Sequence, residues 1–431
     1  MKTLIIQPDG PLRGTVHLPG DKSITHRAFI LGALGEGETT VSGYCRGEDC
    51  LNTLRAIQAL GIQVNEESAQ VMITGKGLWG MTEPSEPLDC GNSGTGMRLL
   101  SGVLSGQDFF SIITGDASLR SRPMGRIVRP LRMMGATIAG RKAGEYAPLA
   151  ITGGNLHGCD YESPVASAQV KSSVLFAGLL AEGTTRFTEP IQSRDHTERL
   201  LRYLGIPLQV EKPMVAINGR VSFEGRPLVV PGDLSAAAFF LVAASIVPES
   251  EVYLPNVGIN PARAGILEIL ADMGADIEVQ NRREASGEPV ADLVARSSSL
   301  HGIHIGESRI PKTIDELPIL CVAAAAAKGE TQITGAQELR VKETDRIHAM
   351  AQELGKLHVS IQETPDGLRI QGGTTFHGAA CHSLGDHRVA MSLAVAGLLA
   401  DSPTMIDDPD CIETSFPDFE GKLLELLTNS P

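Results

Sequence analysis

The chain has 431 residues, is 42% hydrophobic and carries a formal net charge of −14. This length suffices for two cores of ordinary domain size, and an aromatic fraction of only 4% requires cores built mainly from Ala, Leu, Ile and Val. The acidic balance excludes a broad nucleic-acid or anionic-membrane surface, since both require a basic face.

No segment predicts a membrane span or an export signal. The N-terminal apolar run is too short for a signal peptide, and no stretch approaches the roughly 18 apolar residues of a spanning helix. The seven cysteines are irregularly spaced, with Cys45 and Cys50 closest together, and none forms a Cys-x-x-Cys pair. We therefore expect buried free thiols and a cytoplasmic location.

One unit recurs six times along the chain: an apolar helix, a turn, a short strand and an amphipathic helix that ends at Gly. The apolar helices are expected at His26–Leu34, Met97–Leu104, Ala168–Ala181, Ser235–Val247, Glu316–Lys328 and His387–Ala400. Strands are expected after them, at Thr39–Ser42, Phe110–Thr114, Thr185–Thr188 and Thr331–Thr334 among others. The second helices are expected to stop at Gly61, Gly135, Gly205, Gly274 and Gly355, and the sixth at the chain end, because Gly is the favoured residue after a helix. With a period of roughly 70 residues, each unit is a small α/β layer that must bury its face against its siblings.

A longer echo divides the six units into two sets of three. The segment 18–23, Leu-Pro-Gly-Asp-Lys-Ser, precedes the first apolar helix, and 230–235, Val-Pro-Gly-Asp-Leu-Ser, precedes the fourth. Where the copies agree, at Asp21 and Asp233, we expect a structural role as helix caps. Where the copies differ, as at Lys22 and Leu234, we expect a functional role for the differing residue. Two similar α/β domains fit this pattern better than one.

Several cations lie in short loops rather than on helix faces. They are Lys22, Arg27, Arg120, Arg122, Arg194, Lys342, Arg346 and Arg388. Each one alone is explained by a solvated surface charge. Because loops on one side of repeated α/β units converge, the set together predicts a cationic pocket for a small polyanion.

Uncharged donors accompany these cations. The segment 91–96, Gly-Asn-Ser-Gly-Thr-Gly, precedes an apolar helix, so its N–H groups can meet an oxyanion and Gly94 permits close approach. Ser167 and Gln169 stand at another helix start, where capping is an equal explanation. Neither a P-loop nor a Gly-x-Gly-x-x-Gly turn after a strand is present, which argues against nucleotide hydrolysis and dinucleotide chemistry.

Two carboxylates supply candidate acid–base groups. Asp315 opens the fifth apolar helix, where a helix cap is the simpler role, and Glu343 follows Lys342 at another helix start. Among cations both would stay ionised or titrate together, as acid–base work requires. The His residues are scattered without metal-ligand spacing. The sequence therefore predicts an enzyme that uses no metal.

At these residues the chain resembles the 5-enolpyruvylshikimate-3-phosphate synthases, also called 3-phosphoshikimate 1-carboxyvinyltransferases. The motifs that carry the resemblance occur in the family's order nearly end to end: residues 20–27, 91–95, 122–125, 167–169, 340–346 and 386–388. The resemblance implies two domains of three βαβαββ repeats each, an inside-out α/β barrel fold. It places one domain at 14–230 and the other at 1–13 with 231–431. The active site would lie in the cleft between them, which closes on substrate.

The resemblance also implies roles for single residues. Shikimate 3-phosphate would be bound by Lys22, Ser23, Arg27, Ser167, Ala168, Gln169, Arg194, Asp315 and Lys342. Phosphoenolpyruvate would be bound by Lys22, Gly94, Arg122, Gln169, Arg346 and Arg388. Asp315 would take the proton from the attacking 5-hydroxyl, and either Glu343 or Lys22 would protonate the methylene carbon. Elimination of phosphate from the tetrahedral intermediate then completes a step of the shikimate pathway, towards chorismate and the aromatic amino acids.

The family implies no cofactor and no metal, small-molecule substrates only, no nucleic-acid or membrane partner, and a monomer in the cytoplasm that is a target of glyphosate. The chain departs from the better-known bacterial pattern at two places. Ala168 replaces the second Ser of a Ser-Ser-Gln triplet, and Glu413-Thr414-Ser415 stands where many relatives have a Lys that contacts phosphoenolpyruvate. Both resemble the family's second class, which includes glyphosate-tolerant enzymes, some with Ala where this chain has Gly94; glyphosate response is left open.

Two other functions were weighed. UDP-N-acetylglucosamine enolpyruvyl transferases share the architecture, but their mobile loop carries a Cys before Arg-Pro where this chain has Asp116-Ala117-Ser118 before Arg122-Pro123. A ring-shaped nucleic-acid clamp can also be built from six repeats, but it requires a basic inner face. The acidic balance and the placement of Asp315 and Glu343 disfavour the clamp.

Overall fold

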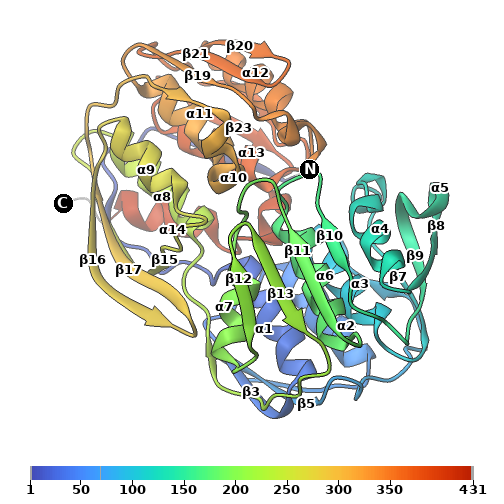
Figure 1. The fold of residues 1–431 in the computed structure, drawn as a ribbon. Helices are drawn as coiled ribbons and strands as arrows, with labels where there is room; N and C mark the ends of the chain where they lie inside the picture. Colours follow the sequence, from blue (N-terminus) through green and yellow to red (C-terminus); the bar gives the residue numbers. More distant parts are fainter. Residues whose placement is uncertain (1, 68, 429–431) are drawn as a thin grey trace. The chain divides into compact units, whose positions relative to one another are not determined.

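The computed structural model, which describes residues 2–67 and 69–428, divides into two units (Figure 1). Unit 1 comprises the described parts of residues 1–19, 232–283 and 289–431, and unit 2 comprises residues 20–231 and 284–288. Within the described residues each unit contains three small sheets.

Unit 2 shows the repeat in its second and third copies. The second copy runs β6 (Leu88–Asp89), α3 (Gly94–Ser105), β7 (Phe110–Thr114), α4 (Gly125–Met133), β8 (Thr137–Gly140) and β9 (Tyr146–Thr152), with η1 (Leu119–Ser121) and the short turn α5 (Arg141–Gly144) inserted. The third runs β10 (Asp160–Glu162), α6 (Ala168–Leu180), β11 (Thr184–Thr188), α7 (His196–Tyr203), β12 (Leu208–Glu211) and β13 (Met214–Asn218). In both copies the first two strands are parallel and the last two are antiparallel. This is the βαβαββ order that the sequence resemblance implied.

The first copy in unit 2 takes its first strand from a distant part of the chain. It contains α1 (Lys22–Leu34), β3 (Glu36–Ser42), α2 (Glu48–Ala59), β4 (Gln63–Glu66) and β5 (Gln70–Lys76). The strand β14 (Leu228–Val229) pairs in parallel with β3 and completes the sheet. Repeat 1 is therefore closed only when residues after repeat 3 have folded back.

Unit 1 repeats the same plan. The fourth copy contains β2 (Arg13–Thr15), α8 (Leu234–Ile246), β15 (Glu251–Gly258), α9 (Gly265–Asp272), β16 (Asp276–Ala285) and β17 (Glu288–Arg296). The fifth contains β18 (His304–Ile305), α11 (Leu317–Ala326), β19 (Glu330–Ile333), α12 (Arg346–Lys356), β20 (Ser360–Thr364) and β21 (Gly367–Gln371), with η2 (Glu307–Arg309), α10 (Ile310–Thr313) and η3 (Gln337–Val341) inserted. The sixth contains β22 (Ala380–His382), α13 (His387–Gly397), β23 (Thr404–Asp407), η4 (Pro409–Thr414), α14 (Phe419–Thr428) and the N-terminal strand β1 (Thr3–Ile6). β1 is antiparallel to β23.

The two Pro-Gly-Asp segments, at which the chain passes from one unit to the other, have matching backbone hydrogen bonds. The N–H of Asp21 donates to the Pro231 carbonyl at 2.8 Å, and the N–H of Asp233 donates to the Pro19 carbonyl at 2.9 Å. Both Asp side chains cap the following helix, as expected from the repeated segment. Residues 14–19 lie with unit 1, whereas the sequence placed them in the other domain, because β2 pairs in parallel with β15.

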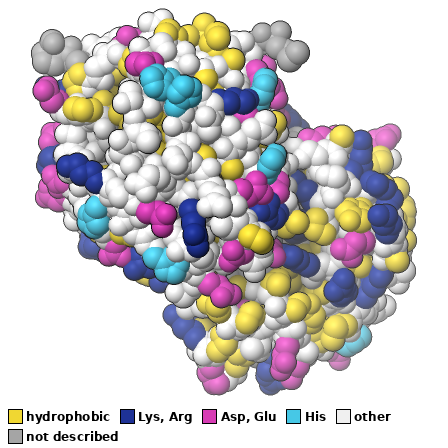
Figure 2. Space-filling view, turned by 90° about the horizontal axis from the view of Figure 1, so that it is seen from above, with side chains coloured by type: hydrophobic (Ala, Val, Ile, Leu, Met, Phe, Trp, Pro, Cys, Tyr) yellow, Lys and Arg dark blue, Asp and Glu magenta, His cyan; other side chains and the backbone are white. Residues whose placement is uncertain are grey.

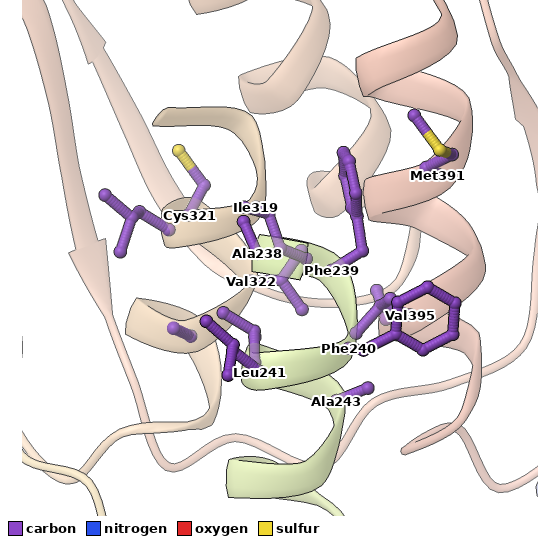
Figure 3. Close-up of a cluster of buried hydrophobic side chains, with 14 of the residues drawn as sticks. Ala238, Phe239, Phe240, Leu241, Ala243, Ile319, Cys321, Val322, Met391 and Val395 are labelled. Carbon is purple, nitrogen blue, oxygen red and sulfur yellow. The ribbon is translucent and has the colours of Figure 1, made fainter. Parts of the chain in front are cut away.

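Three helices form the centre of each unit: α8, α11 and α13 in unit 1, and α1, α3 and α6 in unit 2. Figure 3 shows the unit 1 cluster, where Phe239 and Phe240 of α8 approach Val322 of α11 and Val395 of α13. These helices are mostly apolar, and a helix with apolar residues on several faces is stable only when those faces are buried. The sequence placed all six, with ends within a few residues of the observed ones, except that α1 begins four residues before His26.

Most of the expected helix ends are confirmed, and one is wrong. Gly61, Gly135, Gly205 and Gly274 follow their helices with positive φ, as C′ glycines do. Helix α12 instead runs through Gly355 to Lys356, and His358 adopts the positive φ of 66°. Gly355 therefore lies inside the helix, because the chain turns three residues later. The expected end of the sixth helix with the chain reaches residues 429–431, outside the described residues.

The seven cysteines are free; Cys159 and Cys411 are half-buried and the other five are buried. Within the described residues, no helix is both long enough and apolar enough to cross a bilayer. On the face drawn in Figure 2, Lys and Arg side chains are interspersed with Asp and Glu side chains. This mixture agrees with an acidic chain whose cations are concentrated only locally.

Candidate active site

In unit 2, the first turn of α1 presents Lys22 and Ser23. Asp21 caps the helix by accepting from the Ile24 N–H at 2.9 Å. Lys22 is the first helical residue, and its Nζ donates to Asp49 Oδ2 at 3.0 Å. Its side chain remains 15% exposed, so the ammonium is held in one place while part of it stays accessible. Ser23 follows in a half-buried position.

Arg27, one turn further along α1, is buried and held by three oxygen atoms. Its Nε donates to Thr197 Oγ1 at 2.7 Å, its Nη2 to Ser172 Oγ at 2.6 Å and its Nη1 to the Ser23 carbonyl at 2.7 Å. A guanidinium has five N–H donors, so two remain for a ligand. Burial lowers the pKa of Arg27 to about 10, and the nearby positive charge of Arg194 adds to the shift. Two cations held this close favour an anion between them.

A second group surrounds the N-terminus of α3. Ser93 caps the helix by accepting from the Gly96 N–H at 3.0 Å, and Gly94 is the first helical residue. A Cβ added at Gly94 would lie 2.8 Å from Arg98 Nη1 and 3.4 Å from Arg122 Nη1. Arg122 also donates to Asn92 Oδ1. The absence of a side chain at Gly94 thus leaves room for two guanidinium groups at the end of a helix.

Gln169 connects this group to the start of α6. Its Oε1 accepts from Arg98 Nη1 at 2.7 Å, and its Nε2 donates to Thr95 Oγ1 at 2.9 Å. Ser167 caps α6 by accepting from the Val170 N–H at 3.4 Å, and Ala168 is the first helical residue. The structure therefore brings the predicted residues of the third repeat next to those of the second.

The hydrogen bonds described for Arg27, Arg98 and Arg122 go to uncharged oxygen atoms, whereas Asp49 is bonded to Lys22. Bonds to neutral oxygens orient a guanidinium without cancelling its charge. Unit 2 thus places Lys22, Arg27, Arg98 and Arg122 near the N-terminal ends of α1, α3 and α6, where the helix dipoles also favour anions.

In unit 1, Arg346 is the centre of a charged cluster. It is the first residue of α12, only 1% exposed, and its Nε donates to Asp386 Oδ2 at 2.8 Å while its Nη2 donates to Glu343 Oε2 at 2.7 Å. Asp386 and Glu343 outweigh the opposing effect of burial and raise the pKa of Arg346, so it stays charged. Its Nη1 is buried and makes no hydrogen bond within the described structure. A buried charged donor without a bond is costly unless a ligand supplies the acceptor.

Asp315 lies beside this cluster. Its Oδ1 is 3.7 Å from Lys342 Nζ and 3.8 Å from Arg346 Nη1, and its carbonyl oxygen accepts from Arg388 Nη1 at 2.9 Å. Helix α11 begins at Leu317, one residue after the predicted start, and its N-cap position is Glu316, so the expected cap role of Asp315 is wrong: Asp315 lies in the link after α10. Its carboxylate is therefore directed at cations rather than at helix N–H groups.

Unit 1 thus assembles Asp315, Lys342, Glu343, Arg346 and Arg388, all five predicted there, around one another. The three cations Lys342, Arg346 and Arg388 are matched by three carboxylates once Asp386 is counted. Glu316 is a further buried carboxylate, and burial raises its pKa. Unit 1 offers carboxylates next to cations, which is an acid–base site rather than a purely cationic one.

Three supporting residues were missed by the sequence reasoning. Asp386 holds Arg346, Asp49 holds Lys22, and Thr197 holds Arg27. Asp386 was inside a quoted motif without a role of its own; it also caps α13, accepting from the Arg388 N–H at 2.9 Å. Asp49 and Thr197 carried no local signal.

Within the described residues, no group of three or more His, Cys, Asp or Glu side chains is arranged to hold a metal ion.

Comparison with known proteins identifies the family. The family model described as EPSP synthase (3-phosphoshikimate 1-carboxyvinyltransferase) matches residues 6–423. The chain belongs to this family. It is 53% identical over 417 residues to the 3-phosphoshikimate 1-carboxyvinyltransferase of Geotalea daltonii, covering 97% of each chain. The corresponding protein of Geobacter sulfurreducens is 53% identical, with 98% of this chain and 99% of that one covered.

Solved structures agree with this assignment. The EPSP synthase structure from Acinetobacter baumannii matches with a TM-score of 0.89 and 45% identity, covering 99% of this chain and 98% of that one. At this identity and coverage the two-domain enolpyruvyl transferase fold is shown. The fold class expected from the sequence is confirmed.

The Arg346–Asp386 pair generates a stability prediction. Asp386→Asn leaves a buried guanidinium without its main counter-charge, so the free energy of unfolding of unit 1 should fall by about 3 kcal/mol. The measurement is urea denaturation followed by circular dichroism, since the single Trp79 lies in unit 2 and would not report on unit 1. Glu343→Gln is the control, because Glu343 pairs with the same Arg346 but its side chain is 20% exposed; it should cost less than about 1 kcal/mol. Equal losses for both variants would contradict this account.

Proposed function

We propose that this protein transfers the enolpyruvyl group of phosphoenolpyruvate to the 5-hydroxyl of shikimate 3-phosphate and releases phosphate. The observation that carries the proposal is the placement of Asp315 within 3.8 Å of Lys342 and Arg346, with Arg346 Nη1 lacking a hydrogen bond. A carboxylate base next to an unfilled anion contact is what addition of a hydroxyl to an anionic enol phosphate requires. Family membership points to the same reaction.

Each unit supplies part of each binding site in this proposal. Shikimate 3-phosphate is bound by Lys22, Ser23, Arg27, Ser167, Ala168, Gln169 and Arg194 of unit 2 and by Asp315 and Lys342 of unit 1. Phosphoenolpyruvate is bound by Lys22, Gly94, Arg122 and Gln169 of unit 2 and by Arg346 and Arg388 of unit 1. The support is electrostatic: two multiply charged anions must be neutralised together, and the guanidinium group of Arg27 is oriented by the hydroxyl oxygens of Thr197 and Ser172.

The chemistry is an addition followed by an elimination. Asp315 accepts the proton of the 5-hydroxyl as its oxygen bonds to C2 of phosphoenolpyruvate, and the methylene carbon receives a proton to become a methyl group. The methyl group of the tetrahedral intermediate then loses a proton as the C–O bond to phosphate breaks, which restores the double bond. Lys22 and Glu343 are both candidate proton donors: Lys22 bonds to Asp49, and Glu343 bonds to Arg346. Holding the base and the acid in the correct orientation lowers the activation barrier of the addition.

The first test is the reaction itself. Phosphate release should require both phosphoenolpyruvate and shikimate 3-phosphate, and it should be unaffected by EDTA, because the described residues offer no metal cluster. Asp315→Asn should lower kcat by at least about a hundredfold, since it removes the base without changing the side-chain shape. Phosphate release from phosphoenolpyruvate alone, or loss of activity in EDTA with recovery on adding zinc, would reject the proposal.

Gly94→Ala tests the phosphoenolpyruvate subsite. The added Cβ would press on Arg98 and Arg122, so the KM for phosphoenolpyruvate should rise about tenfold, equivalent to about 1.4 kcal/mol, while the KM for shikimate 3-phosphate should change less than about twofold. Because the φ of Gly94 is not positive, Ala adds no backbone strain, and the melting temperature of Gly94→Ala should equal that of the wild type. The inhibition constant of glyphosate should rise more than the KM for phosphoenolpyruvate.

Gly96→Ala is the matched control in the same helix. Its Cβ would lie 2.8 Å from Thr53 Oγ1 in the core, so it should lower the melting temperature without selecting between the substrates. Equal shifts of both KM values in Gly94→Ala, or a large loss of its melting temperature, would reject the subsite.

The proposal also requires the two units to act on one pair of substrates, so ligand binding should draw them together. The chain passes between them at the two Pro-Gly-Asp segments, where short links permit rotation. Small-angle scattering should show a smaller radius of gyration with shikimate 3-phosphate and an unreactive phosphoenolpyruvate analogue than without ligands. An unchanged radius of gyration would count against closure. Lysozyme measured in the same buffers is the control for the instrument.

A further inference from the structure

The first turn of α7 is clamped in three directions. Its first three residues, His196, Thr197 and Glu198, are all buried and contact three different parts of unit 2. Consecutive helical residues point about 100° apart, so three of them cover more than half of the helix surface. Clamping of this kind fixes both the position and the rotation of a helix end.

Thr197 contacts Arg27 through a network whose hydrogens can be assigned. Ser172 Oγ donates its single hydrogen to the Ala168 carbonyl at 2.6 Å. In the 2.6 Å contact between Ser172 Oγ and Thr197 Oγ1, Thr197 must therefore be the donor. Both hydroxyl oxygens then accept from Arg27, which fixes the plane of its guanidinium at two atoms.

Glu198 ties the same turn to α6. It lies 2.8 Å from Lys171 Nζ, and Lys171 is also 2.9 Å from Glu189 Oε1. Although burial acts in the opposite direction, Glu198 and Glu189 raise the pKa of Lys171, while burial raises the pKa of Glu198 itself. The short distances show that the two side chains are bonded. Since Lys171 precedes Ser172, α6 and α7 are held together at the position where both contact Arg27.

His196 is held by the tip of the β16–β17 hairpin, residues 284–288, which belongs to unit 2 although the chain on either side of it belongs to unit 1. His196 Nδ1 lies 2.7 Å from Glu288 Oε1, and both side chains are at most 2% exposed. A carboxylate only accepts, so Nδ1 carries the hydrogen. Arg199, on the next turn of α7, donates to the Gly287 carbonyl at 3.2 Å, and Ser286 Oγ accepts from the Val229 N–H at 2.8 Å.

We infer that this hairpin tip and the first turn of α7 form a positioning device for Arg27, in which Thr197 and Glu288 set the affinity for shikimate 3-phosphate. The inference rests on the proposed function, since it takes Arg27 as a contact of that substrate. Thr197 orients the guanidinium so that its two remaining N–H donors face the ligand as a pair. Glu288 holds Thr197 in place through His196. Thr197 and Glu288 are positioning residues, because they act through Arg27 and α7.

The test compares Thr197→Val with Thr197→Ser in the full-length protein. Val keeps the shape but removes the oxygen, so the Kd of shikimate 3-phosphate, measured by calorimetry without phosphoenolpyruvate, should rise about tenfold. The KM for phosphoenolpyruvate should change less than about twofold, and Ser should restore the wild-type Kd to within about twofold. A structural role alone would not be rescued by Ser, which lacks the methyl group.

Two further variants separate positioning from general damage. Glu288→Gln should raise the Kd of shikimate 3-phosphate about threefold, whereas Glu284→Gln, the same change at an exposed site on the same tip, should leave it unchanged. In an Arg27→Lys background, Thr197→Val should add little, because the two residues act as one unit. Additive effects in that cycle would overturn the inference.

The outcomes distinguish this inference from the proposed function. If the wild-type protein neither binds shikimate 3-phosphate nor releases phosphate, the proposed function fails and the inference falls with it. If the wild-type protein is active and Thr197→Val has an unchanged Kd, or raises the phosphoenolpyruvate KM equally, the inference alone is overturned. The inference alone is also overturned if Thr197→Val lowers the melting temperature without affecting one substrate more than the other.

Discussion

The structure depends on burying six helices on every side. Most side chains of α1, α3, α6, α8, α11 and α13 are apolar and buried, and polar side chains along them, such as Arg27 and Ser172, are bonded to one another. The predicted site residues on these helices lie in their first two turns. The free N–H groups at a helix N-terminus must be satisfied and attract negative charge. Cap residues such as Asp21, Ser93, Ser167 and Asp386 satisfy some of them.

This constraint also explains why the fold was easier to read from the sequence than the site. A long apolar run predicts a buried helix, so all six apolar helices were predicted with ends near the observed ones. The strands β2 and β14 could not be assigned in the same way, because each is short and pairs with a strand far away in the chain. Gly355 was misread because a glycine near a helix end carries no mark that separates the last turn from the first residue beyond it.

The structure brings predicted site residues together within each unit, and it shows that they are held by residues that were not predicted. Asp386 is 40 residues from Arg346, and Thr197 is 170 residues from Arg27. Contacts at such separations arise from tertiary packing, so single-chain patterns give no spacing rule for them. Asp386 could have been found only by asking which carboxylate neutralises a buried Arg. The sequence therefore allowed predictions for the residues in ordered motifs, but not for the residues that hold their side chains.

The two Pro-Gly-Asp segments show how one scaffold serves two different chemistries. Asp21 and Asp233 cap α1 and α8 in the same way, so the backbone before each helix is shared. The next residue differs: Leu234 is buried in the core of unit 1, whereas Lys22 forms an ion pair with Asp49 and remains partly exposed. Unit 1 then uses Asp233 and Ser235 to bind Arg263, at 2.7 and 2.8 Å, and Ser235 also contacts the buried Glu316. The helix start is thus the same in both copies because each Asp caps its helix, whereas the residue after the cap is a core Leu in unit 1 and a partly exposed Lys in unit 2.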